Sequence, residues 1–312
     1  MHRFQLSILG VAALALILDA AEPRYTWPDP RTNAIVLVNA NQDIRNYLGN
    51  HAGWFQSGET VLDLSVPKRP DSDAAERERV EIVTALQAKG MTAGTYTSGT
   101  TVEPLAAIKL WPFDMAPVEW MPHDFAQAGC WPNEPARRII DVTNARTRHA
   151  LQDGIRRIWK GSPAPIRFVD NAASHSSTGG TQPWAAYCAN IAEIRQLGES
   201  LGCRLVFNIS VHLALLSDPE ATQLVRAVGK DNGILLEVPW GEATRKSAEL
   251  TRKAKARYRQ LLDAGLVIVV LPVTLPVDTL MNWLETWRKP DDRLYLGWPF
   301  FEKPWAPAKV NQ

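Results

Sequence analysis

The stretch "IRFVDNAAS", from Ile166 to Ser174, carries a carboxylate to the end of a short apolar run. Three apolar residues and one arginine precede Asp170, and a run of small polar residues follows the stretch. A short apolar run bounded by turn residues predicts a buried strand. An acid at the end of such a strand, followed by a polar loop, is typical of parallel sheets whose strand ends build a site.

The same pattern recurs along the chain and predicts about eight strands. Besides 166–172, they are "AIVLVNA" (34–40), "TVLDLSV" (60–66), "MTAGTYTS" (91–98), "RRIIDVTN" (137–144), "CRLVFNIS" (203–210), "GILLEVPW" (233–240) and "LVIVVLPV" (266–273). Amphipathic segments with helix start and stop signals lie between many of them. Strands that alternate with helices predict a parallel α/β sheet, and eight such units favour a (β/α)8 TIM barrel over an open sheet.

Composition limits the classes of protein to which the chain can belong. Its 312 residues are 46% apolar and 21% charged, which is typical of a globular protein. The 34 basic and 33 acidic side chains nearly balance, so we expect no nucleic-acid partner. No glycine-rich phosphate loop follows the first strand. The chain reads as one domain, residues 22–312, with a Trp- and Pro-rich insertion at 110–135 between the third and fourth strands.

The N-terminus has the features of an export signal. A weakly basic start leads into "LSILGVAALALIL", an apolar run too short to span a bilayer comfortably, and small residues follow at Ala20 and Ala21. We therefore expect a signal peptide at residues 1–21 and a secreted or periplasmic protein, with an uncleaved membrane anchor as the alternative. The three cysteines are expected to be structural, buried or paired.

Polar side chains converge at the ends of the predicted strands, where a barrel places its active site. Asp170 and Glu237 each follow an apolar run. Two acids in different surroundings can divide the steps of glycoside cleavage, one as acid and the other as nucleophile or water activator. We expect these two to be catalytic, with Glu237 favoured as acid/base, although each could instead cap a helix or pair with an arginine.

Other polar and aromatic residues near the strand ends are expected to bind substrate. They are Asp141, Asn171, Asn208, Tyr96 and Trp240. Asn208 and Tyr96 could equally tie structural elements together. No two histidines have metal-ligand spacing, so we expect no catalytic metal and no cofactor. The loop histidines His175 and His212 are expected to be solvated.

Four segments, "IIDVTNARTRHAL", "IRFVDNAAS", "LVFNIS" and "GILLEVPWG", occur in this order at barrel-like spacing. In this the chain resembles the glycoside-hydrolase-like TIM-barrel proteins whose strands carry D-x-T-N, D-N, an Asn and a Glu in turn. The likeness covers roughly residues 35–274. It implies a secreted or surface protein acting on polysaccharide, with Asp170 and Glu237 as the acid pair.

Two hypotheses of function follow. The first is a glycoside hydrolase of an extracellular or cell-surface polysaccharide. The alternative is a barrel that binds glycan without cutting it, in polysaccharide export or biofilm assembly. In both, the partner is a polysaccharide or oligosaccharide, and no stable membrane span is expected after signal cleavage. An ester hydrolase would need a serine nucleophile, and the sequence has no G-x-S-x-G.

Overall fold

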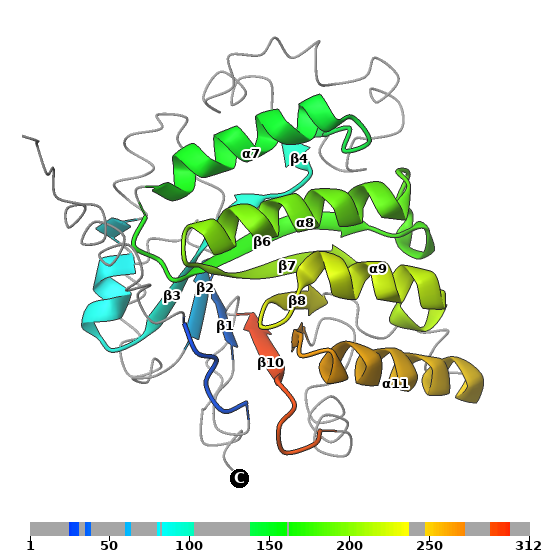
Figure 1. Cartoon of the computed structure of the whole chain (residues 1–312). Coiled ribbons are helices and arrows are strands. Elements are labelled where there is room, and N and C mark those ends of the chain that lie inside the picture. The colour runs from blue at the N-terminus through cyan, green and yellow to red at the C-terminus, as the bar shows by residue number, and fades with distance from the viewer. Residues whose placement is uncertain are drawn as a thin grey trace, which may run out of the picture.

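The protein is built around a parallel sheet that curls back on itself (Figure 1). The computed structural model describes residues 25–30, 35–38, 60–63, 80–81, 83–102, 138–160, 162–236, 247–271 and 288–299. Within them the strands pair in the order β1-β10-β9-β8-β7-β6-β3-β2, and β1 pairs with β2 as well as with β10. The bounds are β1 (Ile35–Val38), β2 (Thr60–Asp63), β3 (Thr92–Ser98), β6 (Ile166–Ser174), β7 (Arg204–Ser210), β8 (Gly233–Leu236), β9 (Val267–Val270) and β10 (Leu294–Pro299).

Helices cover the outer face of the sheet and alternate with its strands. They are α7 (Ala145–Lys160), α8 (Trp184–Ser200), α9 (Asp218–Val228) and α11 (Ala248–Asp263), with the short 3-10 turns η2 (Ser176–Thr178) and η3 (Leu213–Leu215). Figure 1 shows the four helices arranged one beside the next. Local chemistry fixes where α9 begins: Ser217 accepts the backbone N–H of Glu220, whose side chain returns to Ser217 and forms a capping box.

The prediction of a parallel sheet with alternating helices is confirmed, and seven of the predicted strands lie in that sheet. The segment predicted as the fourth strand does contain a short strand, but its predicted place in the parallel sheet is wrong. β3 pairs directly with β6, while β5 (Arg138–Ile139) pairs antiparallel with β4 (Thr101–Val102) in a separate two-stranded sheet. The prediction also missed β10. The insertion expected at 110–135 lies outside the described residues.

Residues 137–144 resemble a strand of the main sheet because Ile140 and Val142 are apolar and buried, at 1% and 0% exposed. Alternating burial normally indicates a strand, but here a side chain supplies part of the hydrogen bonding. Gln182 accepts the N–H of Val142 at 2.8 Å and donates to the carbonyl of Ile140 at 2.9 Å. The N–H of Ile140 donates to the carbonyl of Thr100. The backbone is therefore satisfied without a place in the barrel sheet.

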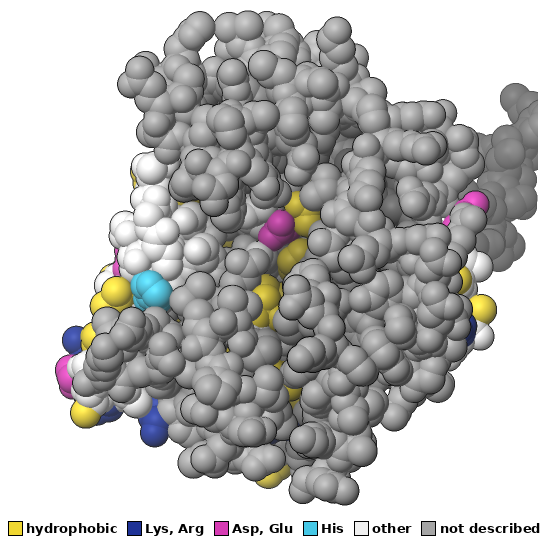
Figure 2. Space-filling model, turned by 180° about the vertical axis from the view of Figure 1, so that it is seen from behind, with side chains coloured by type: hydrophobic (Ala, Val, Ile, Leu, Met, Phe, Trp, Pro, Cys, Tyr) yellow, Lys and Arg dark blue, Asp and Glu magenta, His cyan; other side chains and the backbone are white. Residues whose placement is uncertain are grey.

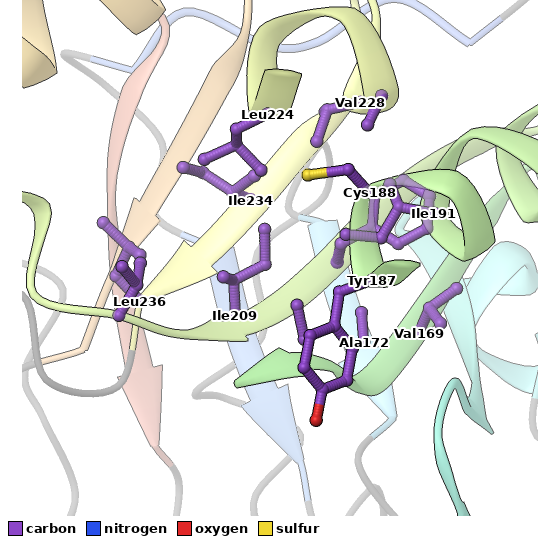
Figure 3. Close-up of a cluster of buried hydrophobic side chains, with 14 of the residues drawn as sticks. Val169, Ala172, Tyr187, Cys188, Ile191, Ile209, Leu224, Val228, Ile234 and Leu236 are labelled. Carbon is purple, nitrogen blue, oxygen red and sulfur yellow. The ribbon is translucent and has the colours of Figure 1, made fainter. Parts of the chain in front are cut away.

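Two apolar layers lie on the two sides of the sheet because strand residues alternate. On β6, Ile166 and Phe168 belong to the cluster inside the curled sheet, whereas Val169 belongs to the cluster beneath the helices. Figure 3 shows the outer layer, in which side chains from β6, β7 and β8 meet Tyr187 and Ile191 of α8. Tyr96 and Phe168 are neighbours in the inner layer, with ring centroids 6.0 Å apart.

Residues 25–30, which we name the N-terminal plug, close the sheet at the end where its strands begin. Tyr25 and Trp27 pack edge to face at 5.2 Å, and Trp27 lies 6.0 Å from Tyr295 near the start of β10. The Trp27 indole N–H donates to the carbonyl of Asp231, two residues before β8, and the Tyr25 hydroxyl meets Thr60, the first residue of β2. The plug thus lies at the end of the sheet where the strands begin, opposite to the carboxyl ends of the strands.

Two of the three cysteines are described, and both Cys188 and Cys203 are free and buried. Burial, with a smaller contribution from the charge of Glu220, raises the pKa of Cys188 to about 12. These thiols are structural, as expected, while Cys130 lies outside the described residues. None of the helices within the described ranges is long and apolar enough to cross a bilayer.

Candidate active site

The structure brings four of the predicted site residues together around the carboxylate of Asp170. Its Oδ1 accepts the backbone N–H of Asn171 at 2.9 Å and the side-chain amide of Asn208 at 2.7 Å. Its Oδ2 accepts the hydroxyl of Tyr96 at 3.0 Å and the side-chain amide of Asn171 at 2.8 Å. Each oxygen thus has two donors, and Asp170 remains partly exposed.

The alternation of strand residues explains why these side chains meet. Phe168 and Val206 face the interior of the curled sheet, and Asp170 and Asn208 lie two positions further along the same strands. On β3, Tyr96 also belongs to the inner cluster, and Ser98 pairs with Asp170 in register. The polar groups therefore take up the interior face where the apolar residues of β6 and β7 end. This is the strand end at which barrels build active sites.

A bulge in β6 lies at the site. The pairing of β6 with β7 is irregular between Val169 and Ala173, and Asn171 has a φ of 49°, in the left-handed region. Asparagine is among the few residues with a side chain that adopt this region readily. Bulges of this kind redirect a side chain next to many active sites. Here the bulge lets both the backbone and the side chain of Asn171 donate to Asp170.

All four groups that contact the Asp170 carboxylate are neutral donors, and no described lysine or arginine forms an ion pair with it. A carboxylate held in this way has a fixed orientation and acts as an acceptor. The four donors fix the direction in which its two oxygens face. Seen from behind, the molecule shows an acidic side chain near hydrophobic ones in the middle of the face (Figure 2).

The other three predicted residues are not part of this arrangement. Glu237 and Trp240 lie outside the described residues. Asp141 is not at the end of a barrel strand, because its segment is held by Thr100 and Gln182 outside the sheet. The Asp141 carboxylate accepts the backbone N–H of Thr143 at 2.9 Å and its hydroxyl at 2.6 Å. These bonds form a local turn just before α7.

His175 holds the loop after β6 in place through hydrogen bonds. The expectation that this histidine is solvated is wrong. His175 is 5% exposed, its Nδ1 accepts the N–H of Ser177 at 3.1 Å, and its Nε2 lies 3.1 Å from a carboxylate oxygen of Glu220. Because Nδ1 accepts, Nε2 carries the proton and donates to Glu220. The polar run after Asp170 therefore forms an ordered turn that joins β6 to α9.

Glu220 makes the stability of this loop depend on pH. Hydrogen bonds from the Ser217 side chain and backbone, together with His175, lower the pKa of Glu220 from 4.5 to about 2. A pKa lowered in the folded state stabilises the protein above about pH 4.5, and this stabilisation is lost as the pH falls towards 2. We expect urea unfolding midpoints to fall more steeply between these pH values in the wild type than in Glu220→Gln. Parallel pH profiles for the two proteins would contradict this assignment.

Three residues that hold the backbone of the site, Gly99, Thr100 and Asn190, were not predicted from the sequence. The N–H of Gly99 donates to the carbonyl of Asp170 at 2.7 Å, and the side chain of Asn190 donates to the carbonyl of Gly99 at 3.0 Å. The signal available was the glycine in "TSGTT" directly after a predicted strand. Only the pairing of β3 with β6 shows that this turn lies against Asp170.

Comparison with solved structures finds this fold in enzymes that act on glycans. A noncanonic maltogenic α-amylase, AmyB from Thermotoga neapolitana, has a TM-score of 0.52 at 10% identity, over 91% of this chain and 75% of that one. An exo-β-N-acetylglucosaminidase of glycoside hydrolase family 20 from Vibrio harveyi has a TM-score of 0.52 at 11% identity, over 86% of this chain. This chain spans half the length of that enzyme, 50%.

A third similar structure is the glycoside hydrolase domain of PelA from Pseudomonas aeruginosa, with a TM-score of 0.48 and 14% identity over 86% of this chain and 94% of that one. No family model and no curated protein sequence matches the chain. At these identities the likeness concerns the fold. The fold of this chain is similar to that of the α-amylase and the exo-β-N-acetylglucosaminidase, which are TIM-barrel glycosidases.

Proposed function

We propose that the protein is a glycoside hydrolase of an extracellular or cell-surface polysaccharide. The observation that supports this most strongly is the carboxylate of Asp170 at the end of β6, oriented by Tyr96, Asn171 and Asn208. In the proposal, Asp170 attacks the anomeric carbon or activates water. Glu237 protonates the leaving oxygen. Asn171, Asn208 and Tyr96 contact substrate hydroxyls, and Trp240 stacks on a sugar ring.

The position of Glu237 in the sequence supports its role. Leu235 belongs to the inner cluster and pairs in register with Asn208, which binds Asp170. A strand period of two predicts that residue 237 faces the same side as Leu235. We accordingly propose that Glu237 faces Asp170 at the mouth of a complete (β/α)8 barrel.

We further propose that residues 22–312 form this barrel as a single domain. Residues 1–21 are then a signal peptide, and the protein is secreted or periplasmic.

The second candidate is a barrel that binds glycan without cutting it, in polysaccharide export or biofilm assembly. The observation in its favour is that both oxygens of Asp170 already accept two protein donors each. A nucleophilic carboxylate needs a free lone pair directed at the sugar. In the hydrolase, substrate binding would have to displace one of these donors.

A polysaccharide panel separates the two candidates. The purified protein is incubated with neutral, acidic and amino-sugar polymers, and new reducing ends are measured over time. Hydrolysis predicts new ends from at least one polymer, and none from the same polymer with the double variant Asp170→Asn, Glu237→Gln. Retention of the protein on a polymer without new ends would reject hydrolysis of that polymer and favour the binding function.

A further inference from the structure

The backbone around Asp170 leaves the regular strand pairing. Asn171, with its φ of 49°, follows Asp170 directly within the part of β6 whose pairing with β7 is irregular. Buried carbonyl groups are normally hydrogen-bonded. Because the pairing is interrupted here, the carbonyls of residues 170 and 171 need donors from elsewhere if the carboxylate is to keep its orientation.

The turn between β3 and β4 supplies those hydrogen bonds. The N–H of Gly99 donates to the carbonyl of Asp170 at 2.7 Å, and the hydroxyl of Thr100 donates to the carbonyl of Asn171. Both carbonyls of the bulge are thus bound by adjacent residues of one turn. Thr100 is 4% exposed, so water has little access to this bond. A buried hydrogen bond to a carbonyl is costly to lose because the acceptor has no solvent to replace it.

The turn is itself fixed from the outer side of the sheet. Asn190 of α8 is 0% exposed, and its side-chain amide donates to the carbonyl of Gly99 at 3.0 Å. Gly99 also has no room for a side chain: a Cβ there would lie 2.9 Å from the Cα of Ala172 and 3.0 Å from Cγ1 of Val169. The turn therefore packs closely against the bulge, and a side chain at position 99 would force the two apart.

We propose that Thr100, together with Gly99 and Asn190, positions the Asp170 carboxylate for the reaction. This inference rests on the proposed function for its catalytic consequence. None of the three residues donates to the carboxylate itself in the hydrogen bonds described. Their effect passes through the peptide groups of residues 170 and 171, so they are positioning residues.

Thr100→Val tests the proposal, because valine keeps the shape of threonine and removes the hydroxyl. The matched control is Thr97→Val, since Thr97 is also buried near the end of β3 but its hydroxyl has no hydrogen-bond partner among the described residues. Thr100→Ser keeps the donor. In protein labelled with ¹⁵N-asparagine, the side-chain amides of Asn171 and Asn208 report their bonds to Asp170 without any substrate.

We expect Thr100→Val to shift both amide resonances and to lower kcat by about ten- to a hundredfold with KM unchanged, because a small misplacement of a reacting group is expensive. Thr97→Val and Thr100→Ser should resemble the wild type in both measurements. Unchanged amide resonances in Thr100→Val, or equal shifts in Thr97→Val, would overturn the proposal. If the wild type cleaves no glycan, the proposed hydrolysis fails, and the resonances still decide whether Thr100 positions Asp170.

Discussion

Asp170→Asn is expected to lower kcat on any responsive glycan by at least about a hundredfold, the range found when a reacting acid or base is removed. An amide is a poor nucleophile and a poor base, so the variant loses both proposed roles of Asp170. It also replaces one acceptor oxygen by an NH2 group facing existing donors. Whichever way the amide turns, two donors lose their present acceptor: the backbone N–H of Asn171 and the amide of Asn208, or the Tyr96 hydroxyl and the side-chain amide of Asn171.

The loss of activity can be separated from a loss of fold. A fully buried donor left without an acceptor costs about 1–3 kcal/mol, and the two donors affected here are only partly buried, so we expect a lower urea midpoint but a folded protein in buffer. The control is Asp153→Asn, at an exposed position of α7, for which we expect wild-type rates. Reducing ends and urea midpoints are measured for all three proteins. Wild-type kcat in Asp170→Asn would remove this residue from the mechanism, whatever its effect on stability.

The site could be predicted from the sequence as far as strand periodicity reaches. Asp170 and Asn208 both end apolar runs, and parallel strands bring such ends to one edge, so the pattern predicts that the two residues lie near each other. The structure shows them in contact at 2.7 Å. Tyr96 was accessible by the same reasoning on β3. The positive φ of Asn171 was not, because a bulge depends on how β6 pairs with β7. A carboxylate with four donors therefore emerges only when the pairing is known.

Most of the strand order could be predicted from the sequence. One failure occurs where the amide of a side chain, instead of a neighbouring strand, hydrogen-bonds the backbone. The buried Ile140 and Val142 give a strand pattern, yet the partner of their backbone is the amide of Gln182, which lies 42 and 40 positions away from them in the sequence. Neighbouring residues carry no information about such a distant partner. β10 was missed for the opposite reason: "LYLGWP" contains a glycine and ends on a proline, both of which weaken a strand prediction.

Trp27→Ala is expected to lower the free energy of unfolding by about 3–5 kcal/mol, the usual cost of truncating a buried tryptophan. Trp27 is 8% exposed and lies between Tyr25 and Tyr295 in the N-terminal plug. Alanine would remove both aromatic contacts and leave the carbonyl of Asp231 without its indole donor. Urea unfolding followed by circular dichroism measures the change. The control Tyr25→Phe removes only a hydroxyl and should cost about 1 kcal/mol.

This variant also tests whether the two ends of the barrel are separate in function. The plug contacts Thr60, Arg204 and Tyr295 near the starts of their strands, whereas Asp170 and Asn208 lie near the ends of theirs. At low temperature, where Trp27→Ala is still folded, kcat per folded molecule should therefore equal that of the wild type. A fall in kcat comparable to that of Asp170→Asn would mean that the plug acts on the site. In barrels, one end of the strands usually contributes to stability and the other carries the active site; that division would then not hold for this protein.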